Sequence, residues 1–307
     1  MALALSGVGG WGELSPELGT LPMEWVPLFR LAGLEEAGPG DLCVLPAQAS
    51  PLQVRACRAQ VLVGSSRQRE HLMSDFVPRF VEVPEPSRVF LDILEGPCRP
   101  PEAPEDWLSP LELAHRFGER ARHAMVHRTA ELGHGVALGA GAVIHPRVRL
   151  GEGVCIGDGT VVGAPGFGLV LLDGVRRPLP HWGGVEVGAG SRIGAQCQIA
   201  AGLLDPTRIG RDCHLDAQIQ VGHNCRIGDG SVLAGQAGLA GSVILGDRCL
   251  VGGQAGFADH VRLGDDCVVA ARAGVTRSWP VGTVLRGFPA RPGSGRRDSG
   301  TRGAPEG

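Results

Sequence analysis

Aliphatic side chains recur at every sixth position along the second half of the chain. A period of six fits neither an α-helix, which repeats every 3.6 residues, nor a strand, which alternates every two. A fixed short period indicates a solenoid, in which each repeat buries its apolar side chains against its neighbours. The members of the series are Val126, Leu132, Leu138, Ile144, Leu150, Ile156, Val162, Val187, Ile193, Ile199, Ile209, Leu215, Val221, Ile227, Leu233, Leu239, Leu245, Val251, Phe257, Leu263, Val269, Val275 and Val281.

Small residues follow most of these aliphatic positions, for example Gly222 and Ala240. Such small residues let the chain turn tightly. The pattern therefore predicts that three six-residue strands make one triangular coil of 18 residues, with the aliphatic side chains inside. The predicted fold class is therefore a β solenoid, a parallel β-helix over residues 126–292. Residues 18 apart are expected to lie one above another on the same wall.

Two interruptions break the period, at residues 163–186 and 200–205. A solenoid expels inserted residues as loops, and such loops often carry function. The first insertion contains Gly166-Phe167-Gly168 and the string Pro178-Leu179-Pro180-His181-Trp182-Gly183-Gly184.

The flanking segments do not follow the repeat. Residues 20–95 alternate apolar patches with a predicted helix at 87–94, which indicates a small α/β domain, a candidate for nucleotide binding. Residues 96–125 form a predicted proline-rich linker followed by a short helix over 111–122. Residues 293–307 lack apolar side chains, so we expect a disordered tail.

Composition excludes several classes of protein. All 29 basic residues are arginine, which excludes a lysine nucleophile, a Schiff base and a Walker-type phosphate loop. A net charge of −3 gives no basic stripe for nucleic acid. The sequence shows no secretory signal and no transmembrane segment, so we expect a cytoplasmic protein. The cysteines form no Cys-x-x-Cys pair, so we read them as small buried thiols, with no metal and no cofactor.

His223 is the principal candidate for chemistry. Gly241 follows 18 residues later, which places its backbone N–H directly above the imidazole, where it could hold an oxyanion. His260 lies 37 residues after His223, which is two coils and one step, so it can line the same groove. Asp216 could orient the ring if the wall brings it close.

Several strings around these residues are similar to one family, the UDP-3-O-(3-hydroxyacyl)glucosamine N-acyltransferases of lipid A biosynthesis, within the hexapeptide-repeat acyltransferase superfamily. The resemblance covers about residues 30–292. The strings are Gln218-Ile219-Gln220-Val221-Gly222-His223-Asn224, Gly235-Gln236-Ala237-Gly238-Leu239-Ala240-Gly241-Ser242, Val251-Gly252-Gly253-Gln254, Gly166-Phe167-Gly168 and Gly287-Phe288-Pro289.

The resemblance implies a left-handed coil and a homotrimer with active sites between neighbouring prisms. It implies acyl transfer from acyl carrier protein to the 2-amine of a UDP-3-O-acylglucosamine. His223 would be the general base, Gly241 the oxyanion donor and His260 a supporting residue of the groove. The substrate-binding residues that we expect are Asp216, Asn224, Phe167, Gly168 and Gln220.

Other functions remain open at this stage. A related hexapeptide transferase could use another sugar with acyl-coenzyme A as donor. A non-catalytic paralogue is a further alternative, since Val44 stands where the family stacks uracil on an aromatic residue. A zinc enzyme of the γ-carbonic-anhydrase type is disfavoured, because no two histidines have the five-residue spacing of that family's pair.

Overall fold

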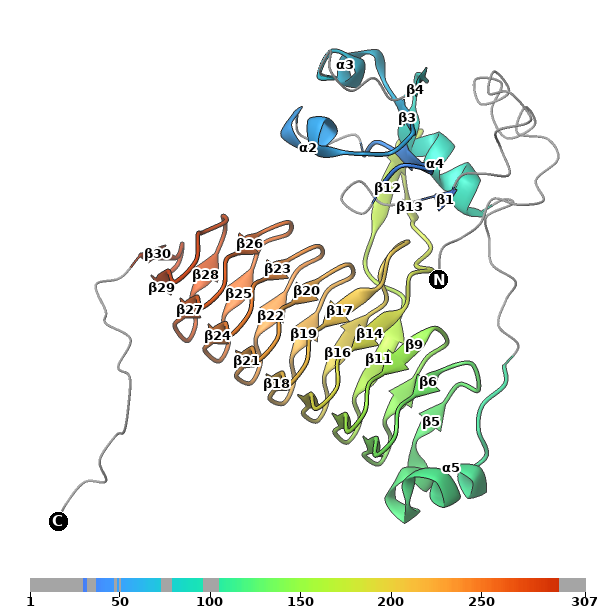
Figure 1. Ribbon diagram of the computed structural model, residues 1–307, viewed down its shortest axis with the longest axis vertical. Helices are drawn as coiled ribbons and strands as arrows, with labels where there is room; N and C mark the ends of the chain where they lie inside the picture. The colour runs from blue at the N-terminus through green and yellow to red at the C-terminus, as the bar shows by residue number, and fades with distance from the viewer. Residues whose placement is uncertain are drawn as a thin grey trace.

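The computed structural model describes residues 30–31, 37–46, 49, 51–72, 79–95 and 105–292 (Figure 1). Two predictions concern residues outside these ranges: the disordered tail at 293–307 and the proline-rich part of the linker at 96–104. The described chain forms a long triangular prism with a small α/β domain beside it.

The prism is the predicted left-handed parallel β-helix, which confirms the fold class. Its strands stack in register on three faces that we call face 1, face 2 and face 3. Face 1 contains β5 (Met125–Val126), β8 (Val143–Ile144), β11 (Val161–Ala164), β16 (Gln198–Ala200), β19 (Gln220–Val221), β22 (Gly238–Leu239), β25 (Gly256–Phe257) and β28 (Gly274–Val275). Face 2 contains β6 (Glu131–Leu132), β9 (Val148–Leu150), β14 (Val185–Val187), β17 (Thr207–Ile209), β20 (Arg226–Ile227), β23 (Ile244–Leu245) and β26 (Arg262–Leu263). Face 3 contains β7 (Ala137–Leu138), β10 (Cys155–Ile156), β15 (Arg192–Ile193), β18 (His214–Leu215), β21 (Val232–Leu233), β24 (Leu250–Val251), β27 (Val268–Val269), β29 (Val284–Arg286) and β30 (Arg291–Pro292).

The sixfold aliphatic side chains fill the prism. On face 1, Ile199 pairs with Val221 and Val221 pairs with Leu239, and each of these residues is no more than 1% exposed. A Cβ added to Gly222 at the neighbouring corner would lie 2.7 Å from the carbonyl carbon of Ala240. The corners therefore need small residues, and the aliphatic register fixes which residues stack.

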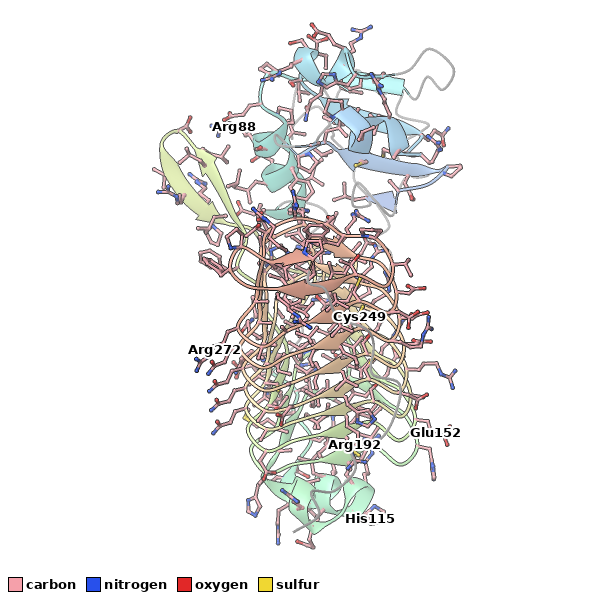
Figure 2. All side chains as sticks on the ribbon, turned by 90° about the vertical axis from the view of Figure 1, so that its left-hand side faces the viewer. Arg88, His115, Glu152, Arg192, Cys249 and Arg272 are labelled. Atoms are coloured by element: carbon pink, nitrogen blue, oxygen red, sulfur yellow. The ribbon has the colours of Figure 1, made fainter. Side chains whose placement is uncertain are left out.

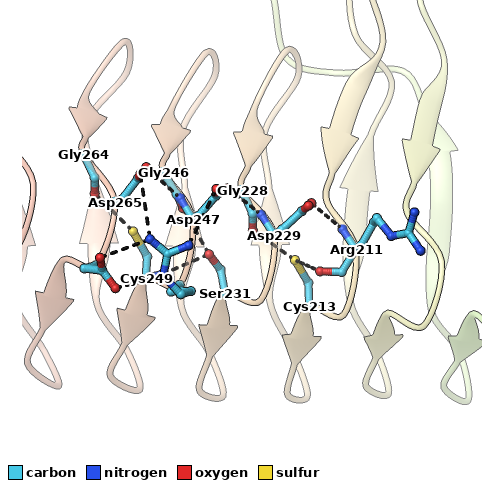
Figure 3. A network of polar contacts seen from close by, with 12 residues as sticks. Arg211, Cys213, Gly228, Asp229, Ser231, Gly246, Asp247, Cys249, Gly264 and Asp265 are labelled. Carbon is cyan, nitrogen blue, oxygen red and sulfur yellow. Dashed lines mark hydrogen bonds and ion pairs between the residues drawn. The ribbon is translucent and has the colours of Figure 1, made fainter.

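Small polar residues inside the prism satisfy backbone groups between coils. The Ser231 hydroxyl donates to the Gly246 carbonyl at 3.1 Å and accepts from the Cys249 N–H at 3.1 Å. The Cys249 thiol donates in turn to the Gly264 carbonyl at 3.4 Å, as Figure 3 shows for this column. The cysteines at this repeat position are buried free thiols, as the sequence predicted.

The N-terminal domain is a parallel sheet of strand order β1-β2-β3-β4 with short helices, which confirms the α/β prediction. The predicted helix at 87–94 is present as α4. The elements are β1 (Arg30–Leu31), β2 (Asp41–Val44), α2 (Pro51–Ala56), β3 (Val61–Gly64), α3 (Ser66–Arg69), β4 (Arg79–Glu82) and α4 (Pro86–Glu95).

The first insertion forms an antiparallel hairpin, β12 (Leu169–Leu172) and β13 (Val175–Pro178), which leaves the prism and lies against α4 (Figure 1). Arg88 of α4 donates to Asp173 of the hairpin turn at 2.7 Å, and Figure 2 shows Arg88 beside this hairpin. Leu179, Trp182 and Leu204 pack against the core of the N-terminal domain. The two interruptions of the repeat therefore connect this domain to the prism.

A helical segment covers the first coil. Helix α5 (Pro110–Phe117) begins with a capping box between Ser109 and Glu112, and the 3₁₀ helix η3 (Glu119–His123) leads into β5. The predicted helix at 111–122 thus divides into these two segments. Within the described residues, no helix has the length and apolarity needed to cross a membrane.

Candidate active site

His223 and both interruptions of the repeat share one corner of the prism, between face 1 and face 2. The chain passes from β11 to β14 through the first insertion and from β16 to β17 through the second. It passes from β19 to β20 through Gly222, His223 and Asn224. We call residues 222–224, 240–242 and 258–260, together with the two interruptions, the His223 corner. This corner collects the segments in which the sequence analysis expected function.

The predicted stacking of Gly241 on His223 is confirmed by the coordinates. A Cβ on Gly241 would lie 2.5 Å from Nε2 and 2.7 Å from Cε1 of the His223 ring. The N–H of Ser242 donates to the His223 carbonyl at 2.8 Å, so the two coils are joined at this point. Only a glycine leaves room for the imidazole beneath the next coil.

His260 belongs to the same corner, as predicted. Its N–H donates to the Gly241 carbonyl at 3.1 Å, and its side chain is exposed. Within residues 105–292, the Gly241 N–H donates to no carbonyl or side chain. The oxyanion role expected for this N–H stays a prediction.

Asn224 determines which nitrogen of His223 carries the proton. Its Oδ1 accepts from the Leu203 N–H at 2.9 Å, and its Nδ2 donates to the Asp205 carbonyl at 3.1 Å. These two backbone partners fix the amide orientation, so the oxygen faces His223 Nδ1 at 3.1 Å. Because this oxygen can only accept, Nδ1 of the neutral ring carries the hydrogen and Nε2 keeps its lone pair.

Asp216 does not orient the ring, contrary to the expectation from the sequence. It lies at the corner between face 3 and face 1, where its carboxylate accepts from the Gly235 N–H at 3.1 Å. The six residues between Asp216 and His223 carry the chain along a whole face. Asn224, the next residue after His223, supplies the orienting contact instead.

Three further predicted residues, Gln220, Phe167 and Gly168, lie on the segments that meet at this corner. Gln220 points outward from β19 on face 1 and is exposed. Phe167 is 83% exposed at the tip of the turn that begins the insertion, and Gly168 follows it. A Cβ on Gly166 in this turn would lie 2.6 Å from Cβ of His223, so the turn packs closely against this residue.

His181 is a residue of this site that the sequence analysis did not single out. Its side chain is 6% exposed, and its ring lies edge-to-face against His223 with centroids 5.1 Å apart. Burial, followed by the positive charge that His223 can carry, lowers the pKa of His181 to about 4, although the Leu179 carbonyl acts in the opposite direction. The available signal was its position at the end of an insertion that returns to the His223 corner.

No metal centre is formed at this corner or elsewhere in the parts of the chain described above. Groups of three or more His, Cys, Asp or Glu side chains that could hold a metal ion do not occur among those residues. The arrangement offers proton transfer by an imidazole and hydrogen bonding by a backbone N–H.

Family models match most of the regular prism. The bacterial transferase hexapeptide model matches residues 129–164 and 206–241, and the hexapeptide repeat of succinyl-transferase matches residues 242–276. The prism is a hexapeptide-repeat domain.

Curated relatives of the chain include proteins named UDP-3-O-acylglucosamine N-acyltransferase. UDP-3-O-acylglucosamine N-acyltransferase from Leptospira biflexa is 43% identical over 81 residues, which are 26% of this chain and 23% of that protein. UDP-3-O-acylglucosamine N-acyltransferase 2 from Legionella pneumophila is 46% identical over 81 residues, 26% of this chain and 24% of that protein. The match thus spans about a quarter of each relative.

Solved structures with similar coils include two UDP-N-acetylglucosamine acyltransferases. The Campylobacter jejuni protein is 24% identical with a TM-score of 0.47, covering 56% of this chain and 73% of that chain. The Arabidopsis protein is 22% identical with a TM-score of 0.38, covering 55% of this chain and 72% of that chain.

Proposed function

We propose that the chain is an N-acyltransferase of lipid A biosynthesis. It transfers a (3-hydroxy)acyl chain from acyl carrier protein to the 2-amine of a UDP-3-O-acylglucosamine, with His223 as general base. The observation that carries this proposal is the geometry of His223, whose Nδ1 faces Asn224 while Nε2 lies beneath Gly241. The shared name of the curated relatives supports the choice of substrate.

The reaction needs one base and one oxyanion donor. The sugar amine attacks the thioester carbonyl as His223 Nε2 takes a proton from the nitrogen. The tetrahedral intermediate carries its negative charge on the former carbonyl oxygen, beside the Gly241 N–H. When the intermediate collapses, the C–S bond breaks and the protonated imidazole returns the proton to the leaving thiolate. The products are an amide and the free thiol of the carrier.

No covalent intermediate on the protein is required by this chemistry. Cys225, the cysteine next to Asn224, is buried, and burial raises the pKa of its thiol to about 12. Such a thiol is a poor nucleophile at neutral pH. Direct transfer from the carrier to the amine therefore fits the residues present at the corner.

The oligomeric state forms part of the proposal. We infer a homotrimer of the 32.0 kDa chain, with each site in a groove between neighbouring prisms. His260 is exposed at the His223 corner, where a neighbouring prism would cover it. Sedimentation should give three times the mass of the chain, and a stable monomer with full activity would contradict this part.

A donor comparison tests the activity itself. Purified full-length protein is given a UDP-3-O-acylglucosamine with the acyl chain on acyl carrier protein, and in parallel with the same chain on coenzyme A. We expect the N-acylated product, formed faster from the carrier protein. If the protein prefers coenzyme A, the donor assigned here is wrong. If neither donor gives product, the proposed function is overturned.

A further inference from the structure

His181 carries two buried nitrogens that have no hydrogen-bond partner among the described residues. The side chain is 6% exposed, and neither Nδ1 nor Nε2 makes a hydrogen bond with the described residues. The Leu179 carbonyl favours the protonated ring but does not meet hydrogen-bond geometry. Since nearly all buried polar side-chain atoms in proteins are hydrogen-bonded, an orphaned imidazole beside a candidate general base indicates a ligand-binding role.

The insertion holds this imidazole against His223. The rings meet at 64° with centroids 5.1 Å apart. A Cβ on Gly166 would lie 2.6 Å from Cβ of His223 and 2.8 Å from Nε2 of His181, while a Cβ on Gly168 would lie 3.3 Å from Cε1 of His181. The turn Gly166-Phe167-Gly168, which we call the roof, therefore packs its two glycines against the His181 ring and lies close to Cβ of His223.

The roof is joined to its surroundings mainly at its ends. The Leu179 N–H donates to the Gly168 carbonyl at 2.9 Å, and the Ala201 N–H donates to the Ala164 carbonyl at 2.8 Å. Between these two points, in the described structure, the N–H groups of Gly166 and Phe167 make no hydrogen bond. Phe167 at the tip is 83% exposed and so adds little packing. Lifting the roof would break few interactions and would uncover the His181 ring.

The charge state of His181 limits what it can bind. With its pKa lowered to about 4, the ring is neutral at physiological pH and offers one N–H donor and one lone pair. A phosphate would be held better by a cation. A neutral group that both donates and accepts, such as a sugar hydroxyl, matches the ring.

We propose that His181 and the roof form a gated part of the acceptor site: the roof lifts, and the His181 imidazole hydrogen-bonds hydroxyl groups of the sugar whose amine His223 deprotonates. This inference rests on the proposed function. His181 is a positioning residue, because it holds the acceptor and leaves the proton transfer to His223.

Two substitutions separate binding from packing. His181→Phe keeps a flat ring and removes both nitrogens, so we expect the KM for the acceptor sugar to rise about tenfold, with the KM for the acyl donor unchanged. His181→Gln keeps a donor and an acceptor, so it should restore much of the wild-type KM. The Tm of His181→Phe should not fall, since the substitution leaves no buried nitrogen unsatisfied. A lower Tm with an unchanged acceptor KM would show a packing residue and overturn the inference.

Binding without turnover gives the independent readout. In full-length protein labelled with ¹⁵N-histidine, UDP-N-acetylglucosamine should shift the His181 ring signals, identified by their loss in His181→Phe. Unmoved His181 signals, at probe concentrations that shift those of His223, would overturn the inference. If the probe moves His181 while no donor gives product, the proposed function fails and the sugar contact stands. If His181→Phe transfers the acyl chain with the wild-type acceptor KM, the sugar contact of His181 is overturned and the proposed function stands.

Discussion

The His223 corner and the corner between face 3 and face 1 use the same backbone for different purposes. Asn224 and Gln218 occupy the same turn position, with φ of 58° and 59°. At the second corner, which we call the glutamine corner, one side chain bonds to the next from Gln196 to Arg272, and Figure 2 shows Arg272 projecting from the prism at the end of the series. The contacts are Gln218 to Gln196 at 3.0 Å, Gln236 to Gln218 at 2.9 Å, Gln254 to Gln236 at 2.7 Å and Arg272 to Gln254 at 2.8 Å.

The difference lies in the hydrogen-bonding capacity that each corner leaves unused. The glutamine corner runs without interruption, so each amide has a partner one coil away. The His223 corner is broken twice, and among the described residues His223 Nε2 and both nitrogens of His181 have no hydrogen-bond partner. The regular coil therefore provides stability, and the interrupted corner provides groups that can bind and react.

Replacing the corner glycine should have the largest effect. Gly241→Ala places a Cβ 2.5 Å from His223 Nε2, so the ring must move. We expect kcat to fall on the order of a hundredfold or more, as for loss of a general base. Gly253 occupies the same turn position at the glutamine corner, and the nearest atom to its added Cβ is 3.2 Å away. Gly253→Ala is the matched control, and equal losses in both variants would show that the effect is structural.

Acid should destabilise the protein through His181. The unfolded chain binds a proton at His181 below an ordinary pKa of about 6.5, while the folded ring resists protonation down to about 4. This contribution to stability is therefore complete above about pH 6.5 and is lost as the pH falls to about 4, up to roughly 3 kcal/mol. Urea unfolding of wild type and His181→Phe across this range measures it. Parallel pH dependence in the two proteins would mean that the ring is not desolvated.

Removing the orienting amide should have an intermediate effect. Asn224→Ala leaves the Leu203 N–H and the Asp205 carbonyl without their partner, which should cost about 1–3 kcal/mol of unfolding free energy. The ring also loses its Nδ1 acceptor, so kcat should fall by roughly fivefold to tenfold. Steady-state kinetics and urea unfolding test the two parts separately. Unchanged kcat would show that another group fixes the tautomer.

The glutamine corner should tolerate change. Gln236→Ala removes two exposed amide contacts, at 2.9 Å to Gln218 and 2.7 Å to Gln254. We expect the free energy of unfolding to change by no more than about 0.5 kcal/mol and kcat to stay at the wild-type value. A large loss of activity here would mean that the division between the two corners is incorrect.

The sequence predicted the parts of the site that follow the coil. The 18-residue period placed Gly241 above His223, because stacking repeats force that register. His260 was found in the same way. The catalytic roles of His223, Gly241 and His260 stay predictions. So do the domain boundaries and the substrate-binding roles expected for Asp216, Asn224, Phe167, Gly168 and Gln220.

The six-residue period does not predict which residues of the two insertions contact His223. His181 approaches His223 through an insertion of irregular length, and no repeat relates the two residues. Asn224 orients the ring through Leu203 and Asp205 of the second interruption, whose backbone positions the sequence pattern does not specify. The sequence analysis expected Asp216 to come close enough to orient the ring, but its separation of seven positions from His223 places it at another corner.

The turnover of His223→Ala tests the central claim most directly. It is compared with Gln218→Ala, a change of the same size at the glutamine corner, using acyl carrier protein as donor and melting temperature as the check on folding. We predict that kcat falls by at least about a hundredfold in His223→Ala, with its melting temperature retained, and that Gln218→Ala keeps wild-type turnover. A near-wild-type kcat in folded His223→Ala would contradict the account.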